Sequence, residues 1–483
     1  MNHRSYVSFM LISLLLLTYL PSSAVEFDAY FLDKTMRMDY YHTGIKDVEI
    51  ISLDNVYEEP ALPSFSRQMW AGNKVNLIDT LNLGKHLVRV FDAESNTLIF
   101  SRGYSSVFGE WQTTDEAAKG IYRTFHETVL FPFPKKPVKV IIATRDKENV
   151  FKDVFSTTID PGSRFVNRER HCPSLNVRAI QKSGDPHTKV DLLILGDGYS
   201  KDDMKLLEKD VSKFTETLFN ATPFKENREA FNVWMIEAPS LDSGIDEPLQ
   251  NLWRRTSFGC SFNSFDLARY VLTLENKAIR DIASLAPYDQ IYFIVNSNQY
   301  GGGGIYNLYS TCYARDEGEK SGWWPDYVFV HEFGHAFGGL GDEYYNSSVA
   351  YNEFYPLGVD PWEPNVGIIK DGQIKWGHMM DADTPIPTPW NKAKYDSLTL
   401  ALQTIDRSAG DYRQKYQQIL QQRDEVYANQ KYAGKVGAFE GSGYASEGLY
   451  RPYLDCRMFS KSLVEFCPVC QKSIEKVIEF HTR

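Results

Sequence analysis

The strongest constraint on the fold is an alternation of apolar and amphipathic runs that begins at residue 189. The apolar run KVDLLILGDGY is followed by SKDDMKLLEKDVSKFTETLF, in which apolar residues recur on one face of a helix. Further apolar runs lie at 231–238 and 290–297, and a helical pattern at 266–284 lies between them. Apolar strands that alternate with helices predict a twisted, largely parallel α/β sheet.

The preceding part of the chain has a different pattern. Between residues 26 and 170, runs such as HLVRVFD and TLIFSRGY alternate apolar and polar residues, and turn-forming residues separate them. This period of two predicts an antiparallel β-sandwich. His42, His86 and His126 stand singly in this part, so we expect no catalytic role for them.

A polar stretch at 171–188 separates the two patterns and predicts a linker. The chain has 483 residues, which is more than one domain usually contains. We therefore predict an α+β multidomain protein, with the β-sandwich at 25–170 and the α/β domain at 189–483.

The first 24 residues are typical of a secretory signal peptide. Arg4 supplies positive charge, FMLISLLLLTYL is a short apolar run, and the small residues of PSSA end at Ala24. The apolar run is short for a bilayer span, so we expect cleavage after Ala24, with an uncleaved anchor as the alternative. After cleavage no membrane span is expected, and the protein would be periplasmic, on the cell surface or extracellular.

Charge and cysteine content narrow the partners and the redox chemistry. The formal net charge is −11 and no long basic run occurs, which argues against nucleic acid or an anionic membrane as the main partner. Six cysteines in an exported chain suggest disulfides. Cys467 and Cys470 form CPVC near the C-terminus, without the context of a redox pair, so a structural bridge that involves Cys456 is favoured. A zinc ribbon of four closely spaced cysteines is absent.

The most informative stretch is YVFVHEFGHAFGGLGDEYY, residues 327–345. A helix that begins at Pro325 places His331 and His335 on one face, about 6 Å apart along the axis. Both imidazoles can then bind one metal ion, while Glu332 faces a neighbouring direction. This spacing suits zinc chemistry, in which the ion acidifies a water molecule and the glutamate accepts its proton and later protonates the leaving amine.

Histidines without a metal and a purely structural zinc ion are the alternatives, because a bare His-Glu-x-x-His also arises by chance. The apolar flanks of this motif would make uncoordinated imidazoles costly. Gly338 lies seven residues after His331, where a sharp turn would end the helix and return the chain toward the metal. The acids Asp342 and Glu343 then follow.

A resemblance to known families rests on HEFGHAFGGLGDEY. This segment resembles the metzincin pattern His-Glu-x-x-His-x-x-Gly-x-x-His, and is more similar to the motif of bacterial IgA-peptidase-like zinc metallopeptidases, which ends in Asp-Glu-Tyr. The third metzincin ligand would fall at Gly341, which has no side chain to bind a metal. The resemblance therefore implies that Zn²⁺ is bound by His331, His335 and Asp342, with Glu343 as the second choice for the third ligand.

The same resemblance implies a methionine turn beneath the metal, followed by a C-terminal helix. Met458 fits this arrangement, whereas Met379 and Met380 are rivals and His378 is a conceivable ligand. A methionine there supports the site by packing. The strand before the active helix, at 304–311, would pair with an extended peptide, while a plain turn explains the glycines before it equally well.

Together these features predict an exported zinc endopeptidase with a metzincin-like catalytic domain, a protein or peptide substrate and Glu332 as general base. Two other classes stay open. A non-catalytic surface protein with a structural zinc site has no need of Glu332, and a zinc amidase that acts on cell-wall amides would differ only in its substrate. Nothing in these residues recognises the hinge of an immunoglobulin.

Overall fold

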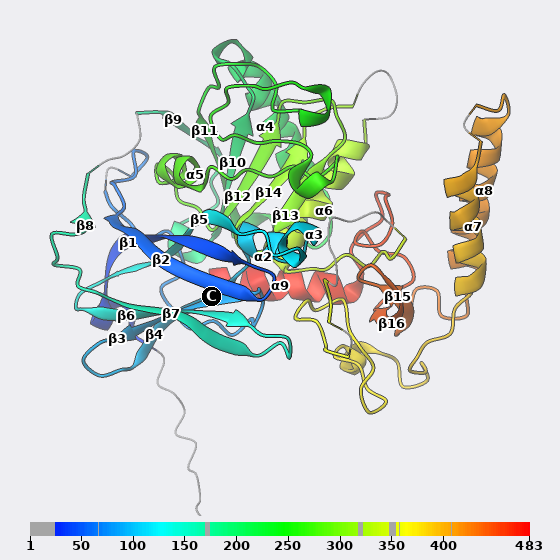
Figure 1. Cartoon of the computed structure of the whole chain (residues 1–483), viewed down its shortest axis with the longest axis horizontal. Coiled ribbons are helices and arrows are strands. Elements are labelled where there is room, and N and C mark those ends of the chain that lie inside the picture. The colour runs from blue at the N-terminus through cyan, green and yellow to red at the C-terminus, as the bar shows by residue number, and fades with distance from the viewer. Residues whose placement is uncertain are drawn as a thin grey trace, which may run out of the picture.

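The computed structural model describes residues 25–65, 67–169, 174–316, 322–346, 354–356, 358–406 and 408–483. The predicted signal peptide, residues 1–24, and Cys172 lie outside these ranges. Within them, no helix has the length and apolar composition that a membrane span requires. Helices and several sheets are combined in one chain, so the predicted α+β class is confirmed (Figure 1).

Two four-stranded sheets make up the N-terminal part. The first has the order β5 (Arg123–Pro134), β1 (Phe31–Ile45), β2 (Val48–Glu58) and β8 (Val166–Asn167). The second has the order β4 (Leu98–Tyr104), β3 (His86–Asp92), β6 (Val138–Arg145) and β7 (Phe151–Ile159). All pairs are antiparallel except β2 with β8. Met38, Val90 and Ile142 from the two sheets share one buried cluster, as in a sandwich with alternating inward side chains.

A six-stranded sheet forms the centre of the second part. Its order is β13 (Gly302–Ile305), β14 (Tyr309–Tyr313), β12 (Gln290–Val295), β10 (Val190–Asp197), β11 (Phe231–Glu237) and β9 (Asn176–Gln181). The four inner strands run parallel, and the two edge strands run antiparallel to their neighbours. Every residue of β10 and β12 is buried, which explains their continuous apolar sequences.

Two predictions from the sequence need correction in this part. The predicted linker at 171–188 contains β9, because NVRAIQ pairs with β11 as a half-buried edge strand. The helix predicted at 266–284 shortens to α5 (Asn276–Ala283). In its first half, Tyr270 is instead bridged to Gly302 and Leu272 to Ser261.

Helix α6 (Trp324–Gly338) carries the histidine motif and packs against β13 and β14. It also contacts α4 (Met204–Phe219) and α9 (Pro468–Thr482). Phe329 stacks on Tyr292 of β12 and on Phe214 of α4, with ring centroids 4.0 and 4.7 Å apart. The helix is apolar on nearly all sides because it is covered on nearly all sides.

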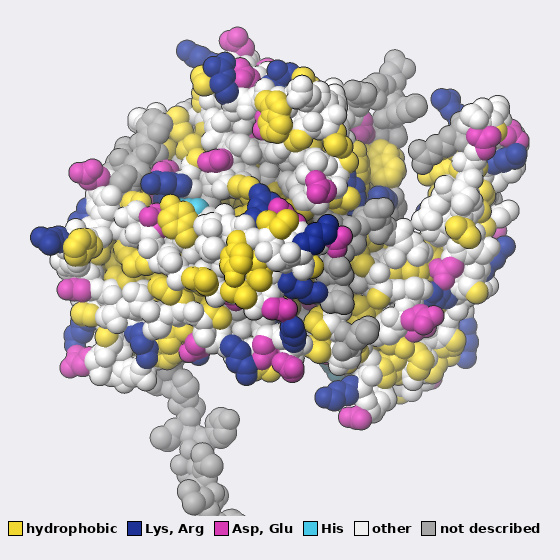
Figure 2. Space-filling view, in the orientation of Figure 1, with side chains coloured by type: hydrophobic (Ala, Val, Ile, Leu, Met, Phe, Trp, Pro, Cys, Tyr) yellow, Lys and Arg dark blue, Asp and Glu magenta, His cyan; other side chains and the backbone are white. Residues whose placement is uncertain are grey.

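The remaining elements are smaller or lie farther out. Helices α7 (Lys392–Thr404) and α8 (Tyr412–Ala428) form a hairpin that projects from the body, and β15 (Phe439–Ser442) pairs with β16 (Ala445–Arg451) beside it (Figure 1). Short helices α1 (Phe27–Tyr30), α2 (Val107–Trp111) and α3 (Asp115–Ala118) flank the sandwich. Basic and acidic side chains are interspersed on the face that Figure 2 shows.

The sandwich is joined to the central sheet through direct hydrogen bonds. The backbone N–H of Ser105 donates to the Tyr306 carbonyl at 2.9 Å, and Asn307 Nδ2 donates to the Gly103 carbonyl at 2.9 Å. Asn73 Nδ2 donates to the last carbonyl of the chain, that of Arg483, at 2.7 Å. The first two contacts bring the sandwich to the edge of the sheet next to α6, and the third joins it to the end of α9.

Candidate metal centre

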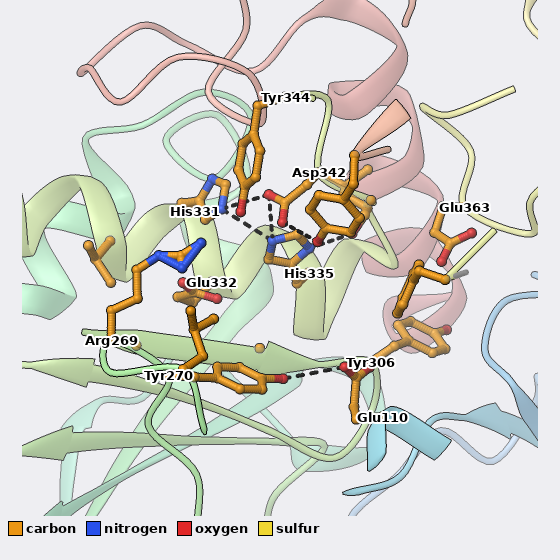
Figure 3. A pocket seen from close by; sticks show the side chains of 18 of the residues that line it. Glu110, Arg269, Tyr270, Tyr306, His331, Glu332, His335, Asp342, Tyr344 and Glu363 are labelled. Atoms are coloured by element: carbon orange, nitrogen blue, oxygen red, sulfur yellow. Dashed lines mark hydrogen bonds and ion pairs between the residues drawn. The ribbon is translucent and has the colours of Figure 1, made fainter. Parts of the chain in front are cut away.

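Three side chains from α6 and the loop after it converge on one point (Figure 3). The Nε2 atoms of His331 and His335 are 3.2 Å apart. Each of them lies close to Oδ1 of Asp342, at 3.2 Å from His331 and 3.3 Å from His335. Ligand atoms of a tetrahedral zinc ion, each about 2.0–2.1 Å from the metal, lie roughly 3.3 Å apart. The triangle therefore has the dimensions of three zinc ligands.

The protons of both imidazoles are fixed by backbone carbonyls. His331 Nδ1 lies 3.0 Å from the Arg457 carbonyl, and His335 Nδ1 lies 2.6 Å from the Leu340 carbonyl. A carbonyl oxygen only accepts, so each Nδ1 carries the hydrogen and donates it. Each Nε2 of a neutral ring then turns a lone pair toward the centre of the triangle, as metal-bound histidines do.

Asp342 supplies the third lone pair and the negative charge. Its Oδ2 accepts a hydrogen bond of 2.6 Å from the Tyr444 hydroxyl, whereas the buried Oδ1 accepts none within the described part of the chain. Burial lowers the pKa of His335, but the Asp342 carboxylate outweighs burial and raises it to about 9. Three lone-pair atoms at these distances need a cation or a proton among them, and two imidazoles with one carboxylate form a donor set that zinc accepts.

The chain reverses after α6 because of two consecutive glycines with different roles. The left-handed residue that ends the helix is Gly339, with φ of 62°, one residue later than the turn predicted at Gly338. Gly338 is instead the last helical residue, and a Cβ there would lie 2.9 Å from Ile474 of α9. Asn365 holds the returning loop by accepting from the Gly341 N–H and donating to its carbonyl, both at 2.8 Å.

Of the two candidate third ligands, Asp342 and not Glu343 lies at the histidines. Met458 is buried beneath α6, where its sulfur would lie 3.2 Å from a Cβ added at Gly334. The Met458 carbonyl also accepts from the Glu343 N–H at 2.8 Å. The rival segment is a short helix, Gly377–Met379, and its His378 is exposed and belongs to none of the metal-type clusters of the described residues.

Glu332 lines the same pocket as the three converging residues. Figure 3 shows its carboxylate beside Arg269, on the side of the histidines away from Asp342. Burial raises the pKa of Glu332, and the charges of His331 and His335 oppose this only in part. Lys461 also lines the pocket. The candidate ligands therefore share this pocket with two basic side chains and with the Glu332 carboxyl group, whose pKa is raised.

The sandwich and the sheet edge complete the pocket walls. Ser105 and Glu110 come from the sandwich side, and the Tyr270 hydroxyl donates to Glu110 at 3.4 Å. The predicted peptide-binding strand at 304–311 is only partly an edge, because β14 lies inside the sheet. Along β13, the backbone of Gly302 is hydrogen-bonded to the 269–271 segment. Just beyond the end of β13, the Ser105 N–H donates to the Tyr306 carbonyl.

Sequence reasoning missed the residues that reach the site from distant segments. Tyr444, Arg269 and Lys461 carry no motif, and Tyr444 lies 102 residues after the aspartate that it contacts. The glycine-rich segment GSGY at 441–444 was the one local signal, because glycines at such a density mark a loop whose backbone approaches other segments closely.

Comparison with known families identifies the family of this chain. The family model described as IgA peptidase M64 matches residues 178–478, and that described as the peptidase M64 N-terminus matches residues 26–156. The chain belongs to the IgA peptidase M64 family. The resemblance drawn from the sequence motif is thereby confirmed. A search of curated proteins found no match.

M64 membership supports a metallopeptidase that acts on proteins or peptides. The two matched regions follow the division between the sandwich and the six-stranded sheet, and the catalytic match includes β9 from residue 178 onward. The histidine motif, the loop with Asp342 and the segment with Met458 all lie inside the match to IgA peptidase M64.

Proposed function

We propose that this protein is an exported zinc endopeptidase whose metal ligands are His331, His335 and Asp342. The observation that carries the proposal is the triangle of two Nε2 atoms and one carboxylate oxygen with edges of 3.2–3.3 Å. The signal-like residues 1–24 support export. Met458 would serve as the methionine turn of a metzincin-like catalytic domain at 189–483.

Zinc bound by these residues would act as a Lewis acid toward the substrate carbonyl and would acidify a water molecule. Glu332 would accept a proton from the attacking water and transfer it to the nitrogen of the leaving amine. Its raised pKa brings its proton affinity closer to that which such a shuttle requires near neutral pH. Arg269 and Lys461 would place positive charge near the oxygen on which negative charge develops.

The shape of the molecule around the pocket favours a polypeptide substrate. Glu110, Trp362 and Glu363 line both this pocket and a neighbouring cavity of 940 Å³. That cavity extends along the sandwich to Lys46 and Arg145. A chain that occupied both would pass the metal centre with residues on either side of the cleaved bond, which is the requirement for an endopeptidase.

The test is the position of the cleaved bonds. We expect the purified chain to cut an unfolded, carboxymethylated protein at internal bonds, as mass spectrometry of the fragments would show. Treatment with a chelator should abolish cleavage, and added zinc should restore it. Release of only terminal residues would contradict the endopeptidase, and hydrolysis of cell-wall amides without cleavage of any polypeptide would favour the amidase.

A further inference from the structure

A second cluster of metal-binding side chains lies beside the candidate metal centre and shares no residue with it. The Sγ atoms of Cys456, Cys467 and Cys470 and a carboxylate oxygen of Glu343 all lie within 4.8 Å of one another. All four residues are buried, with at most 2% of their surface exposed. Glu343 follows Asp342 in the chain, while Cys467 and Cys470 stand at the start of α9.

The distances within this cluster suit a tetrahedral ion bound by sulfur. The Sγ atoms of Cys456 and Cys470 are 3.8 Å apart, and Cys470 Sγ is 3.3 Å from Glu343 Oε1. With zinc–sulfur bonds of about 2.3 Å, two sulfur ligands of a tetrahedral ion are separated by roughly 3.8 Å. A sulfur and an oxygen ligand would be separated by roughly 3.5 Å.

Two features of the cluster stabilise a thiolate, and a third orients the carboxylate. The Cys467 backbone N–H donates to Cys456 Sγ at 3.2 Å, and Cys467 is the N-cap of α9, where the helix dipole stabilises a thiolate. Asn365 Nδ2 donates to Glu343 Oε1 at 3.0 Å, which orients the carboxylate. The other oxygen, Oε2, is buried and has no hydrogen-bond partner among the described residues, which is costly unless a cation is present.

We propose that Cys456, Cys467, Cys470 and Glu343 bind a structural zinc ion. Thiolate ligands select zinc over hard cations such as magnesium and calcium, and the Cys-x-x-Cys spacing of Cys467 and Cys470 is common in structural zinc sites. Four protein ligands in a buried site leave no position open for water, so this ion takes no part in hydrolysis. The proposal goes beyond the peptidase function and does not depend on it.

The ion would join three segments that shape the catalytic pocket. Glu343 is the next residue after Asp342, and its N–H donates to the Met458 carbonyl at 2.8 Å. Cys456 lies two residues before Met458, and the other two cysteines begin the helix that packs against α6. Zinc at this place fixes the loop of Asp342 and the turn of Met458 to α9.

The structural bridge predicted from the sequence is not formed in the structure, where Cys456, Cys467 and Cys470 are free thiols. A disulfide between two of them is the competing state in an oxidising compartment. It would leave the third thiol and the Glu343 carboxylate without a ligand partner. Cobalt in place of zinc separates the two states, because a sulfur-to-cobalt charge-transfer absorption in the near ultraviolet arises only where thiolates bind the metal. The catalytic ligands contain no sulfur, so this absorption reports the second site alone.

We would load the full chain with Co²⁺ as wild type and as His335→Ala, which lacks a catalytic ligand. Both should show the charge-transfer absorption, and Cys470→Ser should lose it together with one metal ion per chain. Cys260→Ala is the matched control, because Cys260 is buried but lies outside the cluster, and it should keep the absorption. If Cys470→Ser does not fold, the wild type and His335→Ala still decide.

The absence of the absorption from both wild type and His335→Ala would overturn the proposal. A disulfide among Cys456, Cys467 and Cys470, detected by mass spectrometry of the unreduced chain, would overturn it as well. Absence of peptidase activity from wild type that shows the absorption would instead count against the catalytic assignment alone.

Discussion

A buried cluster of histidine and carboxylate in the sandwich differs in its hydrogen bonds from the one at α6. In the sandwich, His42 lies between Glu127, at 2.9 Å from Nδ1, and Glu49, at 2.7 Å from Nε2. His86 lies between hydroxyl groups at 2.9 and 3.0 Å. Every ring nitrogen there has a protein partner on its own side.

In α6 the corresponding atoms point at one another. The Nδ1 atoms of His331 and His335 are held by carbonyls, and both Nε2 atoms face a carboxylate oxygen of Asp342 that no described group donates to. The side chains of the sandwich cluster satisfy one another, whereas those of the α6 cluster turn three possible ligand atoms toward one point. Convergent ligand atoms, rather than burial or the presence of histidine, therefore distinguish the candidate metal centre.

The largest expected difference in hydrolysis and in stability is between His335→Ala and His42→Gln. His335→Ala should lose its catalytic metal and all measurable hydrolysis while it remains folded. His42→Gln should leave Glu49 and Glu127 buried without a cation and lower the free energy of unfolding by about 3–5 kcal/mol, with kcat unchanged where the protein is folded. Chemical denaturation and hydrolysis assays on both variants would measure these effects. If both variants lost stability and activity to the same extent, the two clusters would not differ in role. His378→Ala should change neither quantity.

His42 of the sandwich and His335 of α6 should also respond to pH in opposite directions above about pH 6.5. Burial lowers the pKa of His42, but Glu127 and Glu49 outweigh burial and raise this pKa to about 9. The pKa of Glu49 is lowered to about 2. The stability contributed by His42 is fully present below its unfolded pKa of about 6.5 and is lost as pH rises through about 9. The contribution of Glu49 is present above about 4.5 and is lost as pH falls toward 2.

Metal binding by His335 follows the opposite course, because protons compete with zinc until pH exceeds the pKa of about 9 in the metal-free site. Unfolding experiments on wild type and His42→Gln across pH, beside zinc titrations, would measure both trends. If zinc affinity and the stability contributed by His42 changed in the same direction above about pH 6.5, the comparison would be contradicted.

A smaller effect is expected from Tyr444→Phe, which removes the hydrogen bond to Asp342 Oδ2 and leaves the ligands in place. The loss of such a partner typically lowers metal affinity by about 10–100-fold. Competition with a chromophoric chelator would measure the zinc affinity. An unchanged affinity would show that the tyrosine does not orient the carboxylate.

The smallest effect is expected from Met458→Leu. The side chain packs under α6 and donates no ligand atom, so a swap of similar volume should cost less than about 1.5 kcal/mol of stability and leave zinc content unchanged. Thermal unfolding and elemental analysis would test this. Loss of the metal would assign a larger role to the sulfur.

The parts of the site that are local in sequence could be predicted from it. His331, Glu332 and His335 follow from the helical period, and the apolar strands follow from burial on both faces. The choice between Asp342 and Glu343 rested on resemblance, because neighbouring loop residues point in different directions that no period fixes. Tyr444, Arg269 and the cluster of Glu343 with three cysteines could not be predicted, since segments far from α6 in the sequence supply them.

The edge strand β9 was missed for a related reason. Its residues are only half buried, so their alternation is weak against the polar stretch that surrounds them. Pairing with β11 supplies the hydrogen bonds that make it a strand.

The most direct test of the central claim is zinc content measured beside hydrolysis of an unfolded protein, in wild type, Glu332→Ala and Asp342→Ala. We predict that Glu332→Ala keeps the zinc content of wild type and loses hydrolysis, by roughly 10²–10⁴-fold if the glutamate acts as general base. Asp342→Ala should hold one zinc ion fewer per chain and be inactive. Hydrolysis by Glu332→Ala at the wild-type rate, or full zinc content in Asp342→Ala, would contradict the account.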